Sequence, residues 1–135
     1  RDTSATASQP TLIEGIGRSR VEPGFLFDLV DRVIEVPDAA SIAAAWLLEE
    51  LFGHRYGGSS GTNLVACLKL AASMRARGEH GSIISLLCDR GERYAQTLFD
   101  SKWLAARGID IAKWDAALRA TLQDGRWRIS DDGAI

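Results

Sequence analysis

Apolar residues recur at helical spacing in two stretches near the middle of the chain. Over 38–52 they follow the 3.6-residue period of an amphipathic helix. Asp38 or Ser41 is expected to cap the start of this helix by accepting backbone N–H bonds, and Gly53 is expected to stop it. The same spacing predicts a second helix from Leu64 to about Arg77.

Two other stretches have the pattern of strands. The β-branched residues of 31–36 (DRVIEV) predict a short strand, and the apolar run at 82–88 (SIISLLC) is typical of a strand buried on both faces. Further helices are expected at 101–107 and 111–122, before a polar, frayed tail from Asp124. Strands that alternate with helices predict an α/β fold with a parallel sheet. Two or three strands make a poor independent sheet, so we expect part of a larger domain.

Composition and charge narrow the function classes. The chain has 135 residues, a formal net charge of −2 and no basic stripe, which disfavours a nucleic-acid partner. No stretch approaches the roughly 18 apolar residues of a membrane span, so no membrane partner is expected. Cys67 and Cys88 lie in apolar segments, are expected to be buried, and predict a reduced, cytoplasmic setting.

The beginning of the chain predicts a fragment. The opening, 1–10, is polar, has no signal-peptide pattern and is expected to be a loop. Its first residue is not methionine, and the single methionine of the sequence is Met74. The chain is therefore interpreted as a fragment or a cleavage product.

The first candidate for chemistry is the segment from Gly57 to Asn63. It holds three glycines and two serines immediately before a predicted helix. Glycines allow backbone to approach a ligand, and a helix start offers unpaired N–H groups with partial positive charge. The alternative is a flexible loop that only caps the helix. Sequence pattern alone leaves both interpretations open.

The second candidate is 89–94, which follows the apolar strand. Ligands of open α/β sheets collect beyond the carboxyl ends of strands, although a solvated turn has the same composition. His54 and His80 lack metal-ligand spacing, so no metal site is predicted. A triad of Ser59, His80 and Asp89 is a weak alternative, because triads are defined by geometry and no Gly-x-Ser-x-Gly motif is present.

Three motifs together resemble a known family. The segments 13–17 (IEGIG), 58–63 (GSSGTN) and 87–94 (LCDRGERY) resemble the C-terminal third of cysteine synthase, in a variant similar to the actinobacterial branch that includes cysteine desulfhydrases. The resemblance covers about 11–107, with 108–135 as a C-terminal helix and tail. It implies a tryptophan-synthase-β-like (fold type II) enzyme with a three-layer parallel sheet, pyridoxal 5′-phosphate (PLP) as cofactor, and a homodimer. The whole chain would be the C-terminal segment of the PLP-binding large domain.

The resemblance also implies a reaction. The expected function is PLP-dependent β-replacement, which forms cysteine or a related amino acid from an activated serine through an aminoacrylate. One alternative is a cysteine desulfhydrase, which eliminates the β-substituent to give pyruvate, ammonia and sulfide. Another is a non-catalytic binding module that retains part of the fold.

Site residues follow from the same resemblance. It assigns Ser59 to the pyridine nitrogen of PLP, Gly15 to backbone beside the cofactor, and Asp89 to the strand end near the pyridine edge, where many cysteine synthases have a different residue. The family's Schiff-base lysine has no match among the lysines of this chain, which are Lys69, Lys102 and Lys113. No catalytic residue is therefore expected here, and the chain alone is expected to be inactive. Its expected partners are the remaining N-terminal part of the enzyme and a small amino-acid substrate.

Overall fold

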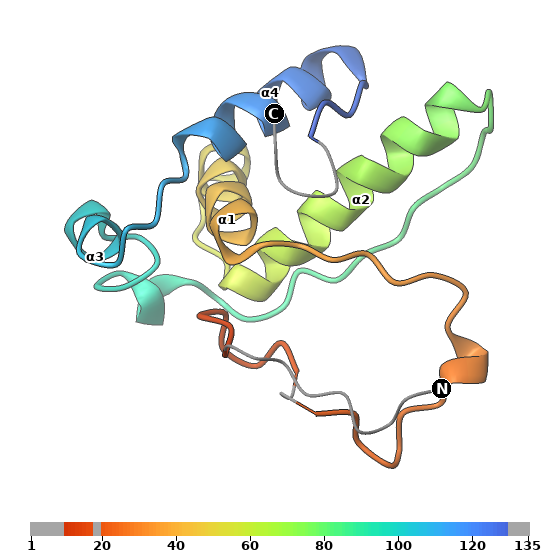
Figure 1. Ribbon diagram of the computed structural model, residues 1–135. Helices are drawn as coiled ribbons and strands as arrows, with labels where there is room; N and C mark the ends of the chain where they lie inside the picture. The colour runs from red at the N-terminus through yellow and green to blue at the C-terminus, as the bar shows by residue number, and fades with distance from the viewer. Residues whose placement is uncertain (1–9, 18–19, 130–135) are drawn as a thin grey trace.

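Helices dominate the described part of the molecule. The computed structural model describes residues 10–17 and 20–129; the rest of the polar opening lies outside these residues. Three helices, α1, α2 and α4, pack against one another, and the short α3 lies at one side (Figure 1). The elements in chain order are η1 (Phe27–Leu29), α1 (Asp38–Phe52), α2 (Gly58–Ala76), η2 (Glu92–Tyr94), α3 (Ser101–Ala105) and α4 (Ala112–Asp124). Among the described helices, none combines the length and the hydropathy of a membrane-spanning segment.

The first helix confirms its predicted bounds but not its predicted cap. Alanine, the best helix former, supplies five of the fifteen positions of α1, and Gly53 ends it in a left-handed conformation with φ 69°. No side chain caps its start. The Asp38 carboxylate instead accepts hydrogen bonds from the Thr11 hydroxyl and the Leu12 N–H, both at 2.6 Å. Asp38 therefore ties the N-terminal segment to α1.

The second helix starts earlier than predicted. It begins at Gly58, so the expected glycine-rich loop is already the first turn of α2. Gly61 allows α1 and α2 to cross closely: a Cβ at this position would lie 2.0 Å from the carbonyl oxygen of Ser41. The Thr62 hydroxyl donates to the Ser41 hydroxyl at 2.7 Å beside this crossing. The close contact between the two helices thus requires a residue without a side chain at position 61.

Two apolar clusters form the core. The larger lies among α1, α2 and α4, and the smaller joins the N-terminal segment to α1 and the region around η2 and α3. The larger holds Ala40, Ala43, Ala44, Leu47, Val65, Trp114, Ala117, Leu118 and Ile129. The smaller holds Ile13, Ile42, Tyr94, Leu98 and Leu104. Cys67 is only half-buried on α2, so its expected burial is partial.

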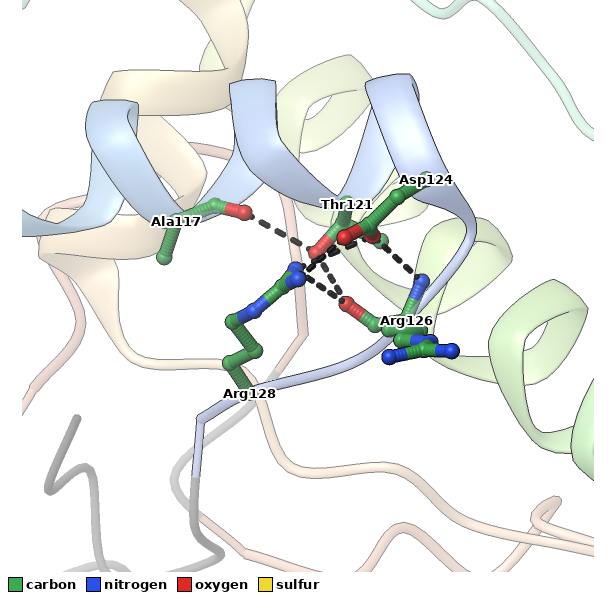
Figure 2. Close-up of polar contacts among 5 residues, drawn as sticks. All are labelled: Ala117, Thr121, Asp124, Arg126 and Arg128. Carbon is green, nitrogen blue, oxygen red and sulfur yellow. Dashed lines mark hydrogen bonds and ion pairs between the residues drawn. The ribbon is translucent and has the colours of Figure 1, made fainter.

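The chain after α4 turns back onto the core as far as Ile129, contrary to the expected frayed tail from Asp124; residues 130–135 of that tail lie outside the described part. The Thr121 hydroxyl oxygen lies 2.9 Å from the Ala117 carbonyl oxygen and 3.1 Å from the Arg126 carbonyl oxygen (Figure 2). Its single proton is therefore shared between these two acceptors. Asp124 accepts from the Arg126 N–H at 2.9 Å and pairs with Arg128. These bonds bring Ile129 into the core, where it is buried.

The predicted parallel sheet is not formed by the described residues. The segments 31–36 and 82–88 run as coil, and pairing is limited to isolated bridges such as the antiparallel one between Tyr56 and Arg90. Val33 is 74% exposed, Ile84 94% and Leu86 73%. A strand exists only when a neighbour satisfies its N–H and C=O groups, and the described residues offer these two segments none.

Candidate functional site

Three distant segments meet around one hollow at the start of α2. They are the turn near Gly15, the first turn of α2, and the stretch that leads from Cys88 into η2. The hollow has a volume of about 340 Å³ and is lined by Glu14, Gly15, Ser59, Cys88, Asp89, Arg93 and Tyr94. The structure therefore brings the three predicted residues, Gly15, Ser59 and Asp89, together. We call this space the α2 hollow.

The two neighbouring serines of α2 have different environments. Ser60 is 1% exposed, and its hydroxyl oxygen accepts a hydrogen bond of 2.8 Å from the Cys88 N–H. Ser59 is half-buried and lines the α2 hollow. Its hydroxyl has no hydrogen-bond partner among the described residues. Ser60 thus holds two segments together, while Ser59 keeps its donor and acceptor capacity for another molecule.

Asp89 lies against the start of α2 and is held on two sides. Its carbonyl oxygen accepts from the Gly57 N–H at 2.9 Å, and a Cβ at Gly57 would lie 2.0 Å from its Oδ1. The Tyr94 hydroxyl donates to its Oδ2 at 2.8 Å. Burial of Tyr94, with its bond to Asp89, raises the pKa of the phenol to about 12, so Tyr94 remains a donor at neutral pH. The Asp89 carboxylate therefore has a defined position at the hollow.

The turn at Gly15 forms the other wall. Gly15 has φ 74°, a left-handed conformation that glycine adopts without strain. Ile13, two residues before it, is 2% exposed and belongs to the smaller apolar cluster. Its burial and the bonds to Asp38 fix this turn against the helices. The wall is thus part of the packed structure.

The mouth of the hollow carries charge and a thiol. Arg93 Nη2 lies 3.3 Å from Glu14 Oε2, but both side chains are about two-thirds exposed, so the pair contributes little stability. Cys88 is exposed, against the expectation that it is buried. The Asn63 amide nitrogen lies 3.7 Å from its sulfur and donates to the Leu86 carbonyl at 3.0 Å. Asn63 and Ser60 together hold the 82–88 segment along α2.

Other candidate residues lie elsewhere. His80 lines a different hollow beyond the end of α2, together with Met74, so it does not assemble with Ser59 and Asp89. None of the three lysines lines the α2 hollow. Sequence reasoning did not single out Tyr94 as the donor to Asp89. Only its presence in the 87–94 motif pointed to it, because no general spacing rule predicts a bond between residues five apart in a turn.

The chemistry of the α2 hollow is that of binding. It offers a neutral hydroxyl beside a helix start, whose dipole is equivalent to about half a positive charge. It also offers unobstructed backbone at Gly15, and a carboxylate with one oxygen already engaged. Such groups suit a small polar molecule that forms hydrogen bonds with the hydroxyl and the helix start.

Comparison with known proteins adds sequence relatives to this geometry. The chain is 50% identical over 115 residues to an L-cysteine desulfhydrase of Mycobacterium tuberculosis, covering 85% of the chain and 31% of the relative. It is 40% identical over 96 residues to an N-(2-amino-2-carboxyethyl)-L-glutamate synthase of Ralstonia nicotianae, covering 71% and 28%. It is 31% identical over 104 residues to cysteine synthase 1 of Neurospora crassa, covering 76% and 27%. No family model matches the chain.

The similarity spans most of the chain. The three aligned stretches are 96 to 115 residues long, so a single short motif does not account for the similarity. The chain spans between about a quarter and a third of the length of these relatives. Within that span, the chain is a homologue of members of the cysteine synthase-like family.

Proposed function

We propose that this chain is part of a PLP-dependent enzyme that performs β-replacement, forming cysteine or a related amino acid from an activated serine. The observation that carries the proposal is the meeting of Gly15, Ser59 and Asp89 around the α2 hollow. Two relatives named as synthases, including cysteine synthase 1, support the synthetic direction.

The residues of the α2 hollow fit the ring end of PLP. A volume of about 340 Å³ lies within the range of small-molecule sites. The Ser59 hydroxyl, which has no partner among the described residues, would hold the pyridine nitrogen, and Gly15 would leave room beside the ring. Bound PLP supplies an electron-withdrawing ring that stabilises negative charge on the substrate.

Ser59 also sets the electronic character that we propose for the site. A neutral hydroxyl does not hold a proton on the pyridine nitrogen as a carboxylate would, so the ring withdraws electrons less strongly. Such a ring favours reactions in which a β-substituent leaves quickly over those that need a long-lived carbanion. Asp89 is the carboxylate in this hollow with one oxygen bound to Tyr94, which limits its availability to a ligand.

We further propose that the rest of the active site comes from additional sequence of the same enzyme. The cofactor's lysine has no match at the α2 hollow, and the segments 31–36 and 82–88 have no strand neighbours among the described residues. Both segments would pair into the three-layer parallel sheet of the large domain, in a homodimer. On this proposal the 135-residue chain alone has no turnover.

A second candidate is β-elimination, favoured by the 50% identity to an L-cysteine desulfhydrase. The complete protein that contains this sequence separates the two. β-Replacement predicts cysteine from O-acetylserine and sulfide, whereas elimination predicts pyruvate and sulfide from cysteine. A purified complete protein without a yellow, borohydride-reducible absorption band would contradict both candidates.

A further inference from the structure

A second and larger hollow lies between the C-terminal half of α2 and the chain that follows α4. Its volume is about 680 Å³. Four cationic side chains line it, and no Asp or Glu is among its described lining residues; the cations are Arg32, Lys69, Arg75 and Arg126. The whole chain has a net charge of −2, so this positive charge is a local feature, and we call the space the basic hollow.

The basic hollow is separate from the α2 hollow. Ser59 and Arg75 are 16 positions apart on α2, which corresponds to about 24 Å along the helix axis. The two spaces share none of their described lining residues. A ligand here would therefore not touch the groups proposed to bind PLP.

The packing of the fold places Arg75 and Arg126 at this hollow. A Cβ at Gly125 would lie 2.9 Å from Arg75 Nη1, so the guanidinium lies directly against the backbone at the end of α4. The neighbouring Arg128 pairs with Asp124, whereas the guanidinium of Arg126 lies apart from that pair and toward α2 (Figure 2). The hollow thus receives Arg126, which forms no ion pair with the described residues at contact distance.

Trp127 forms part of the wall of the basic hollow. Its indole nitrogen is buried, so it does not face the open space of the hollow. The three arginines that line the hollow, Arg32, Arg75 and Arg126, are exposed. Like charges gathered around one space repel one another and attract a counter-ion of opposite charge. One bound anion relieves this repulsion.

We propose that the basic hollow binds an anion of the phosphate or sulfate class. Arg32, Arg75 and Arg126 hold its oxygens, and the side chain of Trp127 lies beside them in the wall of the hollow. Guanidinium groups suit such anions because they donate two parallel hydrogen bonds to a pair of oxygens. The anion is either free or a phosphoryl group of a larger molecule.

Calorimetric titration of the complete holoprotein with inorganic phosphate, and separately with AMP, tests the proposal. At least one is expected to bind saturably, and binding of AMP without phosphate would assign a phosphoryl group on a larger molecule. Arg75→Gln and Arg126→Gln are each expected to weaken binding about tenfold. Arg128→Gln is the matched control on the same turn, with unchanged affinity expected.

A nuclear magnetic resonance measurement adds a readout that is local to the hollow. The indole N–H resonance of Trp127, assigned with Trp127→Phe, is expected to shift on titration. If Arg75→Gln does not fold, Arg32→Gln on its exposed segment provides the same test. The proposal is wrong if neither anion binds, or if the folded arginine variants bind as tightly as the unaltered protein.

Discussion

The phenolic oxygen of Tyr94 lies 2.8 Å from Oδ2 of Asp89 and donates a hydrogen bond to it. Tyr94 is 6% exposed, whereas Asp89 is exposed at the α2 hollow. The bond therefore joins a residue of the apolar core to a residue of the candidate site. It gives the site a fixed carboxylate whose position depends on a buried side chain.

Removal of this bond is expected to have a measurable cost. Tyr94→Phe should lower the free energy of unfolding by about 1 kcal/mol, because water can solvate the exposed carboxylate that loses its donor. Urea denaturation of the complete protein measures this value. Tyr56→Phe is the control, since its hydroxyl has no hydrogen bond among the described residues. Equal stability of the two variants would contradict a role for the bond.

The same bond predicts a dependence on alkaline pH. The pKa of Tyr94 is raised from 10.0 to about 12, mainly by burial and then by the bond to Asp89. Because the pKa of Tyr94 is higher in the folded state than in the unfolded state, the neutral phenol stabilises the fold. This stabilisation is complete at pH values below the unfolded pKa, and it is lost as the pH rises through the folded pKa. The stability difference between the unaltered protein and Tyr94→Phe should therefore be constant below pH 10 and shrink toward pH 12. A difference that stays constant over this window would refute the assignment.

The neighbouring serines should give opposite phenotypes. Ser60→Ala removes the acceptor of the Cys88 N–H and should destabilise the protein by about 1–2 kcal/mol. Ser59→Ala should change stability by less than about 0.5 kcal/mol, because its hydroxyl has no partner among the described residues. In the complete enzyme, Ser59→Ala should shift the absorption band of the bound cofactor. Each variant is the control for the other, and an unshifted band in Ser59→Ala would remove this residue from the proposed site.

The crossing of α1 and α2 should not tolerate a methyl group. Gly61→Ala places a Cβ 2.0 Å from the Ser41 carbonyl oxygen, so the two helix backbones must separate, at a cost of about 3 kcal/mol or more. Gly24→Ala is the matched control, because a Cβ there meets nothing within 4 Å. Thermal denaturation followed by circular dichroism compares them. Similar transition temperatures would show that the crossing is not as close as described.

A substitution in the exposed apolar segment 82–88 tests whether this segment joins the proposed sheet. Ile84→Asp should change the stability of the 135-residue chain by less than about 0.5 kcal/mol, because Ile84 is 94% exposed there. In the complete protein it should cost about 2–3 kcal/mol if this residue lies in a buried strand. Leu29→Asp, in η1 and 76% exposed, is the control outside the predicted strands. An equally small effect of Ile84→Asp in the complete protein would rule out the buried strand.

The sequence predicts the helices better than their connections. The period and alanine content of 38–52 specify α1 because helix formation depends mainly on neighbours along the chain. The start of α2 was misplaced, because its glycines and serines are used in contacts with Ser41 and Cys88 that lie far away in the sequence. The apolar run at 82–88 predicts a strand, but the segment is coil here because a strand also requires a neighbouring strand, which the described residues do not supply.

Sequence also predicts the candidate site only in part. Gly15, Ser59 and Asp89 were predicted from motifs, and the structure places them around one hollow. Tyr94 was missed as the partner of Asp89, since that bond depends on how the chain turns through η2. The basic hollow was also missed, because its cations come from three regions whose proximity depends on the packing of α4 on α2.

A single helix controls both walls of the α2 hollow. Asp38, at the start of α1, holds the segment that carries the Gly15 turn, and the Ser41 carbonyl touches Gly61 in the first turn of α2. These two anchor points are less than one helical turn apart on α1, so a rigid-body displacement of that helix would carry both walls in the same direction. Such a displacement would leave the distance between the walls nearly unchanged for a ligand.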